Sequence, residues 1–319
     1  MKRIKTFFAI CVLSLISYAS MYGQDIASAM ETYNAGATAL KESNYAVAIE
    51  SFSKALKMLE GMGELDEQGA ATLKDCKNIL PQIYLRYGKE FAAKKDIDNA
   101  LIQLNKAVES AKAVSLGDVE KEANELIPQV ILAGADDNLN LGLFNEALAG
   151  YNKVLTFTPN SADVYLRIGV VQAKLNNEEG AVAAYVKAIE LGDKVDAPKQ
   201  LSTMYLKKSS AAFSAKNYTE AISMGKKANE YLESVQGFQL IGLSAMQIKK
   251  YDEAIPALEA YLAGSESIKN KTSIFYSLAM AYEAKGNNAK ACGYYKKIVT
   301  DPKFKAFAEN KINNVLKCK

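Results

Sequence analysis

Residues 242–258 read GLSAMQIKKYDEAIPAL, and this stretch carries the pattern that decides the fold. Gly242 is followed twelve positions later by Ala254, and Leu258 comes four positions after that. The phrase YDEA at 251–254, an aromatic residue, two polar residues and alanine, marks the start of a helix. Because apolar residues recur on both sides of it at three- and four-residue spacing, the stretch predicts two helices joined by a turn.

The same pattern occurs seven times along the chain. The alanines that anchor it are Ala48, Ala100, Ala147, Ala181, Ala221, Ala254 and Ala291. Twelve residues before each anchor stands a small residue: Gly36, Gly88, Ala135, Gly169, Ser209, Gly242 and Ala279. Small residues at facing positions let two antiparallel helices approach closely, whereas bulky side chains would push their axes apart. Each repeat is therefore predicted to be one helical hairpin in an all-α protein.

A larger side chain, the filler, follows most anchors after four residues. The fillers are Phe52, Leu104, Tyr151, Tyr185, Leu258 and Tyr295, and Gly225 breaks the rule in the fifth repeat. With its small residue, anchor and filler at these positions, the chain resembles the tetratricopeptide repeat family over about residues 29–300. The resemblance implies a right-handed superhelical solenoid of about seven hairpins.

The expected division of the chain follows from the repeats. The array covers 24–302, with repeats near 29–62, 81–114, 128–161, 162–195, 202–234, 235–268 and 272–302. Helix-like insertions are expected near 57–79, 109–127 and 190–200. New helices are predicted to begin at Leu80-Pro81 and at Ile127-Pro128, because proline fixes φ and lacks an N–H.

Residues 303–319 are predicted to form a C-terminal cap. An amphipathic helix over 303–317 would place Phe304, Phe307, Ile312 and Val315 on the exposed end of the array. A solenoid needs such a cap because its last repeat has no following neighbour to cover its apolar face.

Residues 1–23 have the features of a signal peptide. Lys2, Arg3 and Lys5 precede an apolar run over 7–16, and small residues follow near Gly23. The run is shorter than the roughly 20 residues that a membrane helix needs, and no later stretch approaches that length. We therefore expect an exported protein, periplasmic or extracellular and soluble after signal cleavage, with no transmembrane segment.

Charge and composition exclude several classes of function. Removal of three basic residues with the signal leaves 36 Lys and Arg against 36 Asp and Glu. This balance argues against nucleic acid and anionic membranes as partners, since both require a basic excess. The chain has no His, which removes His-based metal sites and Ser-His or Cys-His nucleophiles. We predict no enzymatic activity, no cofactor and no metal.

The mature chain keeps three cysteines. Cys292 lies in the second helix of the last repeat and Cys318 at the end of the cap, so a disulfide between them is one expectation and two free thiols the other. Cys76 is interpreted as a small buried residue rather than a catalytic thiol.

The family resemblance also implies where a partner would bind. In the family, first helices form a concave wall that holds an extended peptide or a partner's helix. The matching positions here are Leu132, Asp136, Leu166, Val170, Leu206, Phe213, Gln239, Leu243, Met246, Tyr276 and Met280. The wall is largely aliphatic with adaptable Met residues and lacks the family's Lys and Asn/Arg carboxylate clamp.

Three interpretations of this wall remain open. The leading one is an exported interaction scaffold that binds a peptide or helix of another cell-envelope protein in an apolar groove. The alternative is a small-molecule or glycan-binding protein with an aromatic-lined pocket, drawn from the 18 Tyr. The same residues could also be packing between repeats.

Overall fold

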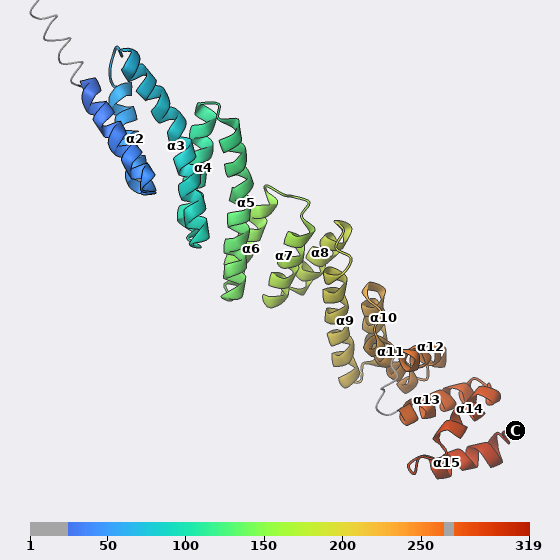
Figure 1. Ribbon diagram of the computed structural model, residues 1–319. Helices are drawn as coiled ribbons and strands as arrows, with labels where there is room; N and C mark the ends of the chain where they lie inside the picture. Colours follow the sequence, from blue (N-terminus) through green and yellow to red (C-terminus); the bar gives the residue numbers. More distant parts are fainter. Residues whose placement is uncertain (1–24, 265–270) are drawn as a thin grey trace, which may run out of the picture. The chain divides into compact units, whose positions relative to one another are not determined.

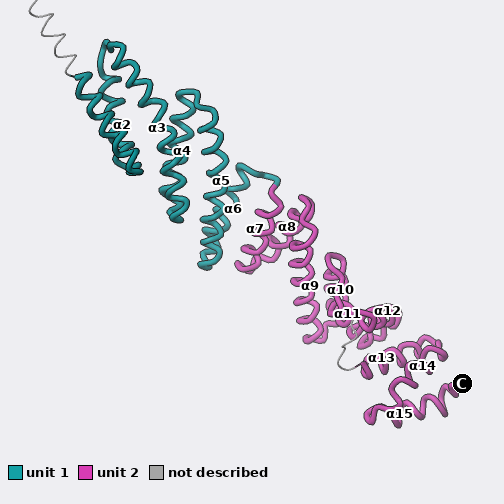
Figure 2. Tube along the Cα trace, viewed as in Figure 1, with its two compact units in different colours: residues 1–160 teal, residues 161–319 magenta. Residues whose placement is uncertain are grey.

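The computed structural model describes residues 25–264 and 271–319, and the predicted signal peptide 1–23 lies outside the described residues. Every regular element in these two ranges is helical, which confirms the all-α prediction (Figure 1). None of the helices in the described ranges has the length and apolar character that a membrane span requires. The chain divides into two compact units, unit 1 (residues 1–160) and unit 2 (residues 161–319) (Figure 2).

In each unit, helices adjacent in sequence pack as antiparallel hairpins. Unit 1 contains the helical residues 25–41, α2 (Tyr45–Glu60), α3 (Glu67–Ala93), α4 (Ile97–Ala113), α5 (Gly117–Asn140) and α6 (Phe144–Leu155). Unit 2 contains α7 (Ala162–Lys174), α8 (Glu178–Glu190), α9 (Asp196–Ser214), α10 (Tyr218–Tyr231), α11 (Val235–Gln247), α12 (Tyr251–Ala263), α13 (Lys271–Ala284), α14 (Asn288–Ile298), α15 (Lys305–Asn310) and the π-helical η1 (Lys311–Val315).

The small residues of the repeat stand where the two helices of a hairpin meet. A Cβ on Gly169 would lie 2.5 Å from Cδ1 of the filler Tyr185, and a Cβ on Gly242 would lie 2.6 Å from Cδ2 of Leu258. All seven anchor alanines have 0% of their surface exposed. The pattern in the sequence therefore reflects a steric requirement, because a larger side chain at either position would collide with the facing helix.

The fifth hairpin meets this requirement in another way. Ser209 replaces glycine in α9, and its hydroxyl donates a 2.7 Å hydrogen bond to the carbonyl of Ala221 in α10. Gly225 supplies no filler, but a Cβ there would lie 2.8 Å from Cγ1 of Ile241 in α11. The next hairpin thus occupies the space that a filler takes elsewhere.

The turn inside each hairpin contains one residue in the left-handed region. At Ser43, Lys95 and Lys249 the φ values are 58°, 60° and 58°, and glycine occupies the equivalent position at Gly142 and Gly286. A single left-handed residue reverses the chain directly between the two helices. The following residue then often caps the second helix through its side chain.

The expectation that new helices begin at the two prolines is wrong. Helix α3 runs from Glu67 through Pro81, and α5 runs from Gly117 through Pro128. Residues 67–79 and 117–127, which belong to the expected insertions 57–79 and 109–127, are the first turns of these long helices. Each proline removes one backbone hydrogen bond. Burial of the apolar stripe that continues on both sides of the proline outweighs that loss. In α3 this stripe contains Cys76, which is fully buried.

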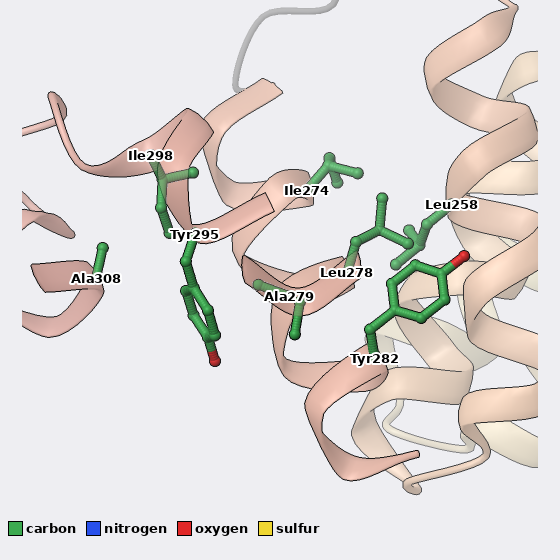
Figure 3. Packing of buried hydrophobic residues seen from close by; sticks show 9 residues of the cluster. Leu258, Ile274, Leu278, Ala279, Tyr282, Tyr295, Ile298 and Ala308 are labelled. Atoms are coloured by element: carbon green, nitrogen blue, oxygen red, sulfur yellow. The ribbon is translucent and has the colours of Figure 1, made fainter. Parts of the chain in front are cut away.

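The last hairpin and the cap enclose a shared core (Figure 3). Its buried residues are Leu258, Ile274, Leu278, Ala279, Tyr282, Ala291, Tyr295, Ile298 and Ala308. A disulfide joins Cys292 of α14 to Cys318, with 5.7 Å between their Cα atoms. The cap is therefore attached to the hairpin both by packing and by a covalent bond.

One detail of the predicted cap is wrong. Val315 was expected to cover the core, but 52% of its surface is exposed, and Leu316 packs against the core instead. The helix widens into a π-turn, in which the N–H of Leu316 donates to the carbonyl of Lys311 at 2.9 Å. This i→i+5 bond adds a residue to the turn and rotates the following residues, so Leu316 takes the inward position.

Burial of the filler Tyr185 makes stability sensitive to alkaline pH. Burial raises the pKa of its phenol from the ordinary 10 to about 12. The phenol of Tyr185 therefore ionises at a lower pH in the unfolded chain than in the folded chain. Its contribution to the free energy of unfolding is complete below pH 10 and is lost as the pH rises to 12. We expect a loss of about 2 kcal/mol over this interval. Urea unfolding of wild type and Tyr185→Phe at pH 9 to 12 checks this prediction. The variant should lose less stability than wild type over this range, and an equal loss would contradict the role given to Tyr185.

Candidate binding surface

The eleven residues transferred from the family lie on first helices, and all are half-buried. Leu132 and Asp136 belong to α5 in unit 1. The other nine belong to unit 2, on α7, α9, α11 and α13.

In unit 2, six of the eleven contribute to packing between hairpins. Leu166 and Val170 of α7 pack against a buried cluster formed by α8 and α9. Leu243, Met246, Tyr276 and Met280 pack against the last core. The ring of Tyr276 stacks on Phe304 of the cap, with 5.0 Å between ring centroids. These side chains are therefore held in place by the repeat itself.

Two of the eleven make polar or aromatic contacts within their own hairpin. The hydroxyl of the filler Tyr151 donates a 2.6 Å hydrogen bond to Oδ1 of Asp136. Phe213 contacts Tyr218 edge to face, with 5.8 Å between ring centroids. Asp136 thus fixes a buried tyrosine, and Phe213 packs across the turn between α9 and α10.

A hollow of about 560 Å³ lies on the first-helix side of unit 2. We call it the α9–α11 hollow, and its lining residues are Thr203, Leu206, Lys207, Ser210, Ala211, Ser214 and Gln236. It forms where α9 and α11, the first helices of two successive hairpins, contact each other. Leu206 is the one residue of the eleven that lines it.

The polar groups of this hollow are available to a ligand. Neither Lys207 nor Gln236 has an ion-pair or hydrogen-bond partner among the described residues, and the side chain of Gln236 is exposed. The Ser214 hydroxyl donates to the carbonyl of Ser210 at 3.0 Å and keeps its own lone pairs as acceptors. The hollow therefore offers donors and acceptors next to the apolar Leu206.

Transfer of family positions missed most of this lining. Thr203, Lys207, Ser214 and Gln236 lie beside the transferred positions, on the flank of α9 and in the first turn of α11. One feature of the sequence could have indicated them. The hydroxyl residues at 203, 210 and 214 are spaced by seven and four, which places them on one face of a helix.

A metal site needs several ligand side chains close together, and a reactive thiol needs a lowered pKa. No group of three or more Cys, Asp and Glu side chains within 25–264 and 271–319 could hold a metal ion. Burial raises the pKa of the Cys76 thiol to about 11, which keeps it protonated at neutral pH. Cys76 is the small buried residue that the sequence predicted.

Stacked hairpins with a small residue facing a filler, and a hollow between first helices, define a helical-repeat protein. Two stretches, residues 162–191 and 240–306, match family models described as tetratricopeptide repeat. These two stretches are tetratricopeptide repeats, as the sequence pattern predicted.

Solved structures similar to this chain are distant in sequence. YrrB, described as a TPR protein with an unusual peptide-binding site, is 21% identical, with 50% of this chain and 77% of that chain covered and a TM-score of 0.31. MamA is 23% identical, with coverages of 56% and 94% and a TM-score of 0.33. PilF of Pseudomonas aeruginosa is 18% identical, with coverages of 61% and 95% and a TM-score of 0.27. No curated protein matches the sequence.

Proposed function

We propose that this protein is a non-catalytic interaction scaffold that binds an extended peptide segment of another protein in the α9–α11 hollow. The observation that carries the proposal is the combination of unpartnered polar side chains with an apolar residue in a hollow between two first helices. An extended peptide exposes an N–H and a carbonyl at nearly every residue, and both need partners on binding. Gln236 alone supplies one group of each kind.

The dimensions of the hollow suit a short segment. Thr203 and Ser214 are eleven residues apart on α9, which corresponds to roughly 16 Å at 1.5 Å per residue. An extended peptide covers that distance in about five residues. Leu206 would contact an apolar side chain of the peptide, and Lys207 would favour a nearby acidic residue or a carboxylate.

This proposal modifies the apolar wall expected from the sequence. Leu166 and Leu243 pack against buried clusters and do not line the hollow. The aromatic side chains of the last hairpin stack on one another, as Tyr282 and Tyr294 do with 5.8 Å between ring centroids. We therefore keep a peptide, rather than a glycan or small molecule, as the proposed ligand.

We further propose that the scaffold acts in the cell envelope after export, either periplasmic or extracellular. The support for this part is the charged and apolar pattern of residues 1–23. The partner would accordingly be another envelope protein, and the proposal needs no cofactor.

A matched pair of variants tests the proposed binding. Ser210→Trp fills the hollow with a bulky side chain, while Ser223→Trp makes the same change on an exposed residue of α10 outside the hollow. Cross-linked envelope proteins captured by wild type are expected on Ser223→Trp and at least tenfold reduced on Ser210→Trp. A tenfold loss of affinity corresponds to about 1.4 kcal/mol. Identical capture by all three proteins would refute binding in the α9–α11 hollow.

A further inference from the structure

A second groove in unit 2, with a volume of about 760 Å³, lies between the second helices α10 and α12. We call it the α10–α12 groove. Phe238 and the buried Ile241, both from α11, form its base, and Pro256 and Ala257 of α12 line one wall. It shares no lining residue with the α9–α11 hollow. The groove is thus a separate surface, with an apolar base from α11 and walls from the second helices α10 and α12.

Carboxylates dominate the rim of this groove. Asp252 pairs with Lys285 at 2.9 Å. Glu253 pairs with Lys226 at 2.6 Å, and this contact is the main reason that its pKa is lowered. Glu230 and Glu233 are exposed and have no ion-pair partner among the described residues. Lys250 also pairs with Glu253, at 3.1 Å, so the unpaired acidic charge of the rim comes from Glu230 and Glu233.

The two walls each contain a polar group that lacks a hydrogen-bond partner among the described residues. Oδ1 of Asn229 accepts hydrogen bonds from the backbone N–H of Ser234 at 3.1 Å and from its hydroxyl at 3.3 Å. The Nδ2 of Asn229 is buried and has no hydrogen-bond partner. On the opposite wall, Pro256 lacks the N–H that the carbonyl of Asp252 would otherwise accept. A peptide that enters the groove could donate a backbone N–H to the carbonyl of Asp252, while Nδ2 of Asn229 lies beneath the surface of the other wall.

We propose that the α10–α12 groove docks a short basic and apolar segment of a partner protein: an apolar side chain on Phe238 and Ile241, flanked by Lys or Arg near Glu230 and Glu233. Charge complementarity selects this occupant, because an acidic rim repels anionic segments and attracts basic ones. The apolar base provides the burial that binding requires. From Lys226 to Glu230 the wall of α10 extends roughly 6 Å, or about one helical turn, and Glu233 follows just after the end of the helix.

A peptide-display selection tests this docking site directly. The bait is the full chain without residues 1–23 carrying Ser210→Trp, which closes the α9–α11 hollow and so separates the two proposals. The probe is a library of random ten-residue peptides. We expect the selected peptides to be enriched in Lys or Arg next to an apolar residue.

Two variants of the bait locate the binding. Glu230→Lys combined with Glu233→Lys reverses the unpaired rim charges, and Ala260→Trp fills the groove without a change of charge. Each should weaken binding of the selected peptides at least tenfold. The control, Glu50→Lys combined with Glu309→Lys, makes the same change of net charge on exposed residues elsewhere and should bind within twofold of the bait. The proposal is overturned if no binder emerges, if basic residues are not enriched, or if the rim variant binds as tightly as the control.

Discussion

Gly242→Ala should lower the free energy of unfolding by about 2 kcal/mol, although alanine is the better helix former. A Cβ at this position would lie 2.6 Å from Cδ2, 2.7 Å from Cγ and 3.2 Å from the backbone N of Leu258. Leu258 is fully buried and cannot move aside. Helix α11 must therefore shift away from α12, and the resulting loss of packing exceeds the gain of about 1 kcal/mol in helix propensity.

The same substitution at Gly293 provides the matched control. Gly293 lies inside α14, is exposed, and has no atom within 4 Å of its Cβ position. Gly293→Ala should therefore stabilise the protein by up to about 1 kcal/mol. Urea unfolding midpoints of the two variants should move in opposite directions. Two shifts of the same sign and size would contradict the steric role of the small residue in the repeat.

Cys318→Ser should release the C-terminal cap and reduce the stability of the last hairpin by about 3 kcal/mol. The bonded cysteines are 26 residues apart, so the disulfide restricts a loop of that length in the unfolded chain. Without it, the cap depends on the stacking of Phe304 on Tyr276 and on the 2.5 Å ion pair between Lys311 and Glu283. Such a short terminal element frays readily when only side-chain packing attaches it.

Hydrogen exchange measured by mass spectrometry checks this second prediction. In Cys318→Ser, exchange should increase over residues 271–319 and remain unchanged over 25–160. Treatment of wild type with a thiol reductant should reproduce the change, and the same treatment should have no further effect on the variant. Wild-type protection of the cap after complete reduction would show that packing alone holds it.

The hairpin pairing was predictable because its steric cause is local in sequence. Each small residue and its filler, such as Gly36 and Phe52, are sixteen positions apart in every hairpin that has both. A larger residue at the small position would collide with the filler and open the hairpin. The sequence therefore shows the constraint directly, as a small residue at that position. The C-terminal cap was predicted on similar grounds, from an apolar face with no repeat left to cover it.

The turns and the long first helices have weaker signals in the sequence. Lys95 and Lys249 adopt the left-handed conformation without being glycine, and they do so because the packed helices on both sides fix the turn. Pro81 and Pro128 suggested helix starts from a local rule, and the tertiary packing of α3 and α5 overrides that rule.

The candidate site was only partly predictable for a related reason. The family positions identify which helices form the wall, and Leu206 does line the hollow. Whether a given residue lines it or packs beneath it depends on how neighbouring hairpins fit together. Leu166 and Leu206 are equivalent in the pattern, yet Leu166 packs against α8 and α9 while Leu206 stays accessible. The spacing of hairpins, rather than the residue type, makes this distinction.

Site-specific photo-cross-linking tests the proposed binding surface most directly. Benzoylphenylalanine would replace Ser210 in the α9–α11 hollow in one variant and the exposed Ser223 in another, each expressed in cells from the sequence that includes residues 1–23. The account predicts discrete protein adducts from position 210 that are absent from position 223. Position 210 giving no adduct, or both positions giving the same adducts, would contradict the claim that the α9–α11 hollow binds a partner protein.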